Sequence, residues 1–197
     1  MGEPEAAWIA VDRAVVAAER ANDPLLMAAG EFRLSLVFLG ARQFDQAAQV
    51  SGSAADALRP LAESGQVEAV ALRGALTLQR AVAAARLNLA DDAYGYLREA
   101  RELGDQVGDG RNDYNTEFGP TNVALHEVAV AVDLGDAGVA LRAAQTVDAS
   151  GCRRNGRHAS RSTLPGRMPS DAKSLTPFQR CWRPVGCHRS WCERCRW

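Results

Sequence analysis

The residues of this chain best suited to chemistry are thiols and an imidazole close to the C-terminus. They are Cys181, Cys187, His188, Cys192 and Cys195. Thiolate and imidazole are the ligands that Zn²⁺ prefers, and the surrounding arginines and tryptophans would suit the phosphates and bases of a nucleic acid. A structural zinc site, however, normally has two ligand pairs separated by a loop, and this short stretch has no room for one. A zinc-binding or nucleic-acid-binding tail is therefore an alternative and not our main hypothesis.

The other catalytic or metal-binding motifs of the chain are incomplete. His126 and Glu127 begin a pattern like that of zinc-protease helices, but Val130 occupies the place of the second histidine. Asp109 opens a stretch like a calcium loop, but Arg111 stands at a ligand position. The sequence has no phosphate-binding loop, no dinucleotide fingerprint and no nucleophile elbow. We therefore expect no catalytic residue and no cofactor, and the prediction is that the protein is not an enzyme.

One polar loop, at residues 112–120, is the best candidate for recognition. It places two aromatic rings among amides and carboxylates, in a protein otherwise rich in alanine and leucine. The predicted partner or ligand surface consists of the loop and the helix after it, with Tyr114, Asn115, Glu117, Phe118, Asn122 and His126. For Phe118 we favour a structural alternative, in which its ring fills the gap between the helices on either side and Pro120 starts the second of them.

The elements that must position this loop are helices. Apolar residues recur at intervals of three and four, and no run alternates β-branched with polar residues, so no strand is expected. Asp23 should cap the second helix, with Pro24 at its first position. Seven helices are predicted, at 5–21, 24–40, 44–62, 67–87, 91–107, 121–134 and 136–148. Because aromatic residues make up only 6% of the chain, the core should be built from aliphatic side chains and alanine.

These helices form pairs that repeat along the chain. An alanine lies in the first turn of the second helix of each pair, and a small apolar residue follows seven positions later on the same face. The residues concerned are Ala47, Ala93 and Ala140, followed by Ala54, Ala100 and Val147. The pattern resembles tetratricopeptide repeats, although those are nearer ~34 residues long. We therefore predict an all-α fold over 1–150, with antiparallel helix pairs stacked as a TPR-like right-handed superhelix. An irregular helical bundle is the alternative.

The composition changes abruptly near Gly151. Residues 1–150 contain 12 Lys+Arg, 22 Asp+Glu and no cysteine, whereas residues 151–197 contain 11 Lys+Arg, 2 Asp+Glu and all five cysteines. The second segment also lacks the apolar periodicity needed to build a core. We therefore predict two parts, a helical repeat domain at 1–150 and a disordered, basic, cysteine-rich tail at 151–197.

The tail has the composition expected of out-of-frame translation of a GC-rich gene. Its codons can be reread in the neighbouring frame, with the free third bases chosen mainly as G or C. The result is an amphipathic sequence without cysteine that contains Val-Ala-Asp-Ala, the counterpart of the start of an earlier repeat helix. A frameshift near Gly151 is the interpretation we favour, and under it the tail cysteines have no evolved role.

The sequence also indicates where the protein resides. No apolar run approaches the roughly 20 residues that cross a bilayer, and the acidic N-terminus does not resemble a signal peptide. Residues 1–150 contain no cysteine, which is typical of cytoplasmic proteins. We expect a cytoplasmic protein that does not associate with membranes.

Four stretches of the chain resemble one known family. They are 8–20, 31–44, 116–123 and 132–142, and they are similar to the C-terminal helical-repeat region of actinomycete XRE-type (lambda-repressor-like) helix-turn-helix regulators. The resemblance covers about residues 2–150. Such regulators carry their DNA-binding domain before this region, and no helix-turn-helix matches here. The resemblance implies a regulatory module that senses a ligand or partner, or dimerises, without binding DNA directly.

The predicted function is therefore that of a non-catalytic interaction module of a transcriptional regulator, truncated and frameshifted. Its expected partner is a protein or peptide, and a second copy of the chain in a homodimer is the other partner considered. Two alternatives stay open, a zinc-binding or nucleic-acid-binding protein acting through its tail, and a free-standing repeat adaptor.

Overall fold

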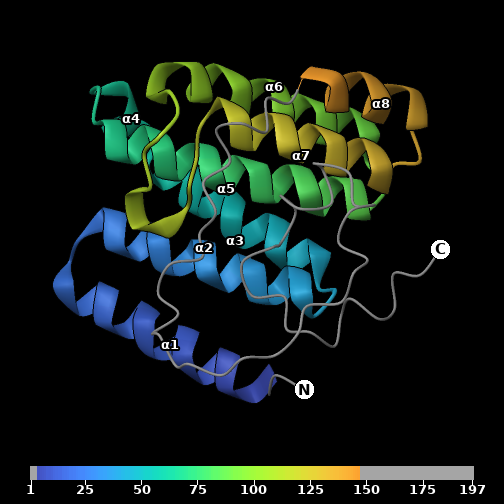
Figure 1. Cartoon of the computed structure of the whole chain (residues 1–197). Coiled ribbons are helices and arrows are strands. Elements are labelled where there is room, and N and C mark those ends of the chain that lie inside the picture. The colour runs from blue at the N-terminus through green and yellow to red at the C-terminus, as the bar shows by residue number, and fades with distance from the viewer. Residues whose placement is uncertain (1–3, 147–197) are drawn as a thin grey trace, which may run out of the picture. The chain divides into compact units, whose positions relative to one another are not determined.

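Alanine- and leucine-rich stretches fold into helices throughout the part of the chain that the computed structural model describes, residues 4–146. Every regular element in this range is helical, so the all-α class is confirmed for it (Figure 1). The elements are α1 Pro4–Ala21, α2 Pro24–Gly40, α3 Phe44–Ala57, α4 Arg59–Glu63, α5 Val67–Arg86, α6 Ala90–Val107, the 3₁₀ turn η1 Asp113–Asn115, α7 Pro120–Asp133 and α8 Ala137–Thr146. The predicted tail at 151–197, with all its cysteines, and Val147 lie outside the described residues.

Short turns with one left-handed residue connect most of these helices. Asn22, Arg42, Asn88 and Gly135, with φ of 49°, 61°, 60° and 75°, follow α1, α2, α5 and α7. One such residue after a helix lets its last carbonyls be satisfied while the chain reverses. At the start of α2 the predicted cap is confirmed, because Asp23 Oδ1 accepts from the Leu25 amide at 2.9 Å and Pro24 stands at the first position.

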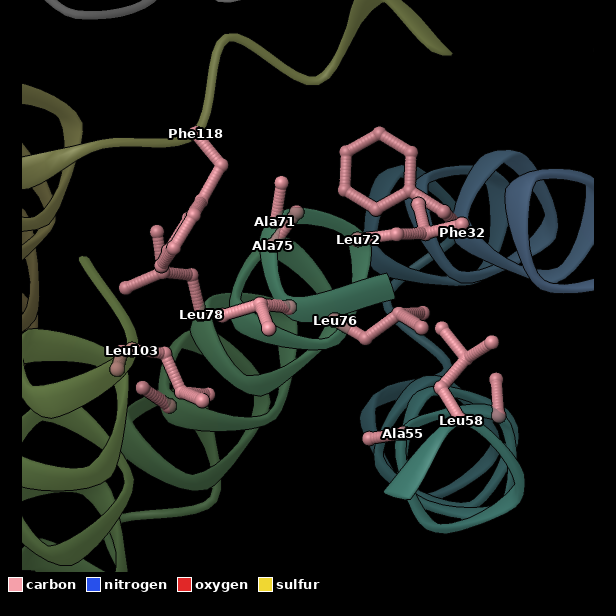
Figure 2. Packing of buried hydrophobic residues seen from close by; sticks show 14 of the residues in the cluster. Phe32, Ala55, Leu58, Ala71, Leu72, Ala75, Leu76, Leu78, Leu103 and Phe118 are labelled. Atoms are coloured by element: carbon pink, nitrogen blue, oxygen red, sulfur yellow. The ribbon is translucent and has the colours of Figure 1, made fainter. Parts of the chain in front are cut away.

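The predicted helix at 44–62 is wrong as a single element. The structure divides it into α3 and α4 at Leu58. Pro60 has no N–H to donate to the carbonyl four residues earlier, and its ring would collide with that carbonyl in a continuous helix. The bend directs the buried Leu58 into the core, where it points toward Leu76 of α5 (Figure 2).

Helix α5 is the centre of the packing. It packs against α2, α3, α4, α6 and α7, and most of its side chains are buried. A helix that is apolar on nearly every side has to be enclosed, and the many alanines of α5 let its neighbours approach closely. Phe32 of α2 lies beside Leu72 on one side of α5, and Phe118 reaches in from the loop on another (Figure 2).

The helix pairs predicted from the repeat are present. Helix α2 packs on α3, α5 on α6 and α7 on α8. The repeated alanines are buried within these pairs, with exposed fractions of 0% for Ala47, 0% for Ala93 and 8% for Ala140. Small side chains at these buried positions allow the helices of each pair to approach closely.

The placement of Phe118 on an exposed surface is corrected by the structure. Phe118 is 2% exposed, and its ring lies directly over Gly74 of α5, where an added Cβ would overlap the ring atoms. The burial of the ring agrees with the structural alternative, but its contact is with Gly74 of α5, whereas that alternative placed it between the helices on either side of the loop. The ring fills the core, and the helix that it covers is α5, which the sequence argument did not name.

Substituting Gly74 with Ala should therefore destabilise the protein, although alanine favours a helix more than glycine does. Overpacking should cost about 3 kcal/mol, whereas the higher helix propensity of alanine should contribute about 1 kcal/mol of stability. We therefore expect the free energy of unfolding to fall by about 2 kcal/mol. Urea unfolding followed by circular dichroism measures this. Gly95→Ala in α6 is the matched control, because its nearest neighbour is an arginine side chain at 3.8 Å. It should stabilise slightly, and equal effects of the two variants would contradict the contact.

Candidate functional site

The loop that joins α6 to α7 is held in one conformation by its own side chains. The Asp109 carboxylate accepts from the Thr121 amide at 3.1 Å and from the Thr121 hydroxyl at 2.9 Å, and so caps the start of α7. Asn112 Oδ1 accepts from the Glu117 amide at 3.1 Å, and the Thr116 hydroxyl donates to the Asp113 carbonyl at 2.8 Å. Polar residues in this segment therefore act mainly as internal partners of the backbone.

Three residues of this loop other than glycine adopt left-handed backbone. Tyr114, Asn115 and Glu117 have φ of 51°, 57° and 50°. This conformation costs a bulky residue roughly 1 kcal/mol or more, and it persists only where the surroundings enforce it.

Two arginines hold the loop backbone in this conformation through hydrogen bonds and ion pairs. Nη2 of Arg33, on α2, donates to the carbonyls of both Tyr114 and Asn115 at 3.0 Å. Arg111 donates through Nε and Nη2 to the Asp113 carboxylate at 2.7 and 2.9 Å, and through Nη2 to Glu68 of α5 at 2.9 Å. The loop is thus fastened to α2 and α5 as well as to its own helices.

The six predicted surface residues do not converge on one pocket. Phe118 is buried and Tyr114 packs against the core, so Asn115 and Glu117 are the exposed members of the set. Asn122 and His126 are partly buried on α7. His126 Nδ1 lies 2.9 Å from the Asn122 carbonyl, and Asn122 Oδ1 is buried with no hydrogen-bond partner. Neither of these two residues lines the groove described next.

That groove lies where α8 departs from α6. Helix α8 packs on α7, and a space of about 640 Å³ is lined by residues of α6, α7 and α8. Its lining combines apolar side chains with charges, in Asp91, Tyr94, Leu97, Arg98, Arg101, Glu127, Val139 and Ala143. Several rim side chains, among them Arg98 and Arg101, are exposed, so the groove is open to solvent.

Helix α6 supplies one wall because it has two distinct stripes. Ala93, Leu97 and Ala100 face the core and are buried. Tyr94 and Arg98 stand one helical turn apart on the neighbouring stripe, which borders the groove. Sequence reasoning missed this wall. The available signal was an aromatic residue spaced with arginines along α6, just beside the alanine face that the repeat had identified.

The charges in the groove are mostly compensated. Arg101 of α6 forms an ion pair with Glu127 of α7. The Tyr94 hydroxyl lies 3.5 Å from Asp136 Oδ2, and burial, with a smaller contribution from that carboxylate, raises the pKa of Tyr94. Arg98 has no ion-pair partner among the residues from 4 to 146. This arrangement can hold an apolar segment and orient it by charge.

The described residues contain no other arrangement with evident chemistry. No three His, Cys, Asp or Glu side chains between residues 4 and 146 gather closely enough to hold a metal ion. The alternative zinc ligands, Cys181, Cys187, His188, Cys192 and Cys195, lie outside this range. Within the same range, no helix combines the length and apolar character that crossing a membrane requires.

The Arg33 contacts lead to a test of the loop. In Arg33→Ala the two carbonyls lose a charged donor, and such bonds stabilise by roughly 1.5 kcal/mol, so the strained segment should open about tenfold more often. Hydrogen exchange at the Thr116 and Glu117 amides measures this opening. Arg42→Ala, at an exposed arginine in the turn after α2, is the control. Unchanged exchange in Arg33→Ala would show that the loop does not depend on this contact.

His126 should make stability depend on pH. Burial lowers its pKa from the ordinary 6.5, opposed by the bond to the Asn122 carbonyl. The folded protein then favours neutral imidazole, so as the pH falls below about 6.5 the unfolded chain takes up the proton first and stability falls. The fall ends once the pH passes below the folded pKa. Urea unfolding at pH 8 and pH 5 should show a larger loss for the native chain than for His126→Gln. Parallel losses would contradict the burial of this ring.

Comparison with known proteins adds no relative to this picture. No protein-family model, no curated protein and no solved structure matches the chain.

Proposed function

We propose that this chain is a non-catalytic interaction module that binds a segment of a partner protein in the groove between α6, α7 and α8. The observation that supports this most directly is the groove itself. Its volume of about 640 Å³ lies within the range of specific binding sites, and apolar side chains line it beside charged ones. A groove between parallel rows of helices fits a helical peptide, which lays an apolar stripe into it.

The proposal places this module in a transcriptional regulator. Its support is the resemblance of the four sequence stretches to the repeat region of XRE-type regulators, together with the repeated helix pairs. In this proposal the pairs stack as a degenerate TPR-like right-handed superhelix. The module senses a partner and leaves DNA contact to another domain, in keeping with the excess of carboxylates in residues 1–150.

Self-association is the second candidate, and a specific observation favours it. Val132 of α7 and Leu141 of α8 are 61% and 68% exposed at the last helix pair that the structure describes. An open apolar face at the end of a repeat array favours association with another surface.

A peptide selection tests the binding proposal. A library of random helical peptides is panned on the full chain, and the affinity of enriched peptides is measured by fluorescence anisotropy. Val139→Asp places a charge on the groove wall and should weaken binding at least about tenfold, which corresponds to 1.4 kcal/mol. Leu26→Asp, at an exposed leucine of α2, is the matched control and should bind normally.

Circular dichroism establishes that both variants are folded. The proposal fails if no peptide is enriched, or if the enriched peptides bind Val139→Asp as tightly as the native chain.

A further inference from the structure

The chain between α6 and α7 forms a loop whose two ends lie side by side. A Cβ added to Gly119 would lie 2.8 Å from both the Gly108 carbonyl oxygen and Asp109 Oδ1. The Asp109 carboxylate also accepts from the Thr121 amide at 3.1 Å, which closes the neck of the loop. Compact loops of about 6–16 residues with close ends, called Ω-loops, are frequently functional. Because the neck is closed on its own, residues 110–118 can detach without separating α6 from α7.

Polar contacts attach this loop to two helices. Arg33 of α2 donates to two carbonyls of the loop, and Arg111 of the loop forms an ion pair with Glu68 of α5. The side chains of Arg111 and Glu68 are 37% and 43% exposed, and ion pairs that water reaches contribute little to stability. The polar contacts therefore hold the loop only weakly.

Apolar contacts supply the rest of the attachment. The Phe118 ring lies over Gly74 of α5, and the half-buried Tyr114 packs against the core. Ala71 and Leu78, one turn to either side of Gly74, are buried in the same core cluster (Figure 2). The ring is thus the main anchor of the loop, and it covers the face of α5 around Gly74.

The attached loop is under backbone strain. Tyr114, Asn115 and Glu117 are left-handed, a conformation that persists only while the surroundings enforce it. Once the anchor leaves α5, these residues can relax to ordinary backbone angles. The short hydrogen bonds of the Asn115, Thr116 and Glu117 amides depend on the left-handed turns, so we expect them to break together with the anchor.

Two glycines at the start of the loop are suited to act as hinges. Gly108 and Gly110 have φ of 71° and 95°, and a Cβ added to either would meet nothing within 4 Å. Residues with this freedom can absorb the change of backbone angles that a moving loop requires.

We propose that residues 110–118 form a lid, hinged at Gly108 and Gly110, that opens as one unit and lifts Phe118 off α5. In the open state, the face of α5 around Gly74 is accessible to solvent while the helix pairs stay packed. A strained segment held by a few contacts is typical of switch regions. This inference is independent of the proposed binding groove, because no residue of the lid lines that groove.

Amide hydrogen exchange on the full chain tests the lid. The reporters are the amides of Asn115, Thr116 and Glu117, which donate to acceptors within the loop at 3.3, 3.1 and 3.1 Å. We expect them to exchange through one shared opening, more frequent than that of the buried α5 amides. Low concentrations of urea should hardly change their rates, because the opening exposes little surface.

Two variants show whether the ring leaves with the backbone. Phe118→Leu weakens the anchor and should accelerate all three reporters by the same factor, about tenfold. Leu76→Val is the matched control, because Leu76 is buried on α5, points toward Leu58 and lies on the side of the helix opposite Gly74 (Figure 2). It should accelerate only the amides that exchange by global unfolding, since its contacts persist when the lid opens.

Either of two results would overturn the lid. Reporters that keep their rates in Phe118→Leu would show that the loop backbone frays while the ring stays on Gly74. Reporters that accelerate in both variants would show that the loop opens only when the whole helical domain unfolds. Circular dichroism and urea unfolding establish that both variants are folded and have lost comparable stability.

Discussion

Enclosure of α5 is the constraint on which the rest of this structure depends. A helix that packs against five others needs small side chains where its neighbours come closest, and α5 carries alanines on several faces and a glycine at position 74, beside its buried leucines. The space over that glycine is filled by Phe118, which comes from a loop far along the chain. The same principle applies at Ala47 and Ala93. There, small buried side chains allow the two helices of a pair to pack closely together.

Much of the fold could be predicted from the sequence, because the patterns that define each helix lie within that helix or its caps. Apolar periodicity and the Asp23 cap depend on residues a few positions apart, and each repeated alanine is marked by the small residue that follows it on the same helix face. The cap and the burial of these alanines are observed. The break at Leu58 was also a local signal, since Pro60 is incompatible with a continuous helix, but the apolar pattern running past it concealed the break. The partner of Phe118 could not be predicted, because the match between a ring and Gly74 exists only once distant segments have packed.

The candidate site was harder to predict for the same reason. A polar loop with two aromatic rings is a reasonable recognition surface by composition, but its polar groups turn out to bond mainly to each other and to the backbone. The groove depends on the distance between α6 and α8, which no spacing within either helix encodes. Tyr94 and Arg98 become neighbours of Val139 only because α8 packs on α7 and leaves α6 uncovered. Local sequence signals thus identify which faces are buried, while the groove is a property of their assembly.

The fastening of the loop by Arg33 has a consequence for how this array folds. Most helices contact their immediate successors, so the helix pairs can form early from contacts that are close in sequence. The bonds from Arg33 to Tyr114 and Asn115 join residues 81 and 82 positions apart, and closing so long a segment requires the intervening helices to be in place. We therefore expect this contact to form late in folding. Its rupture is correspondingly a route by which α1 and α2 can separate from the loop while the central helices remain paired.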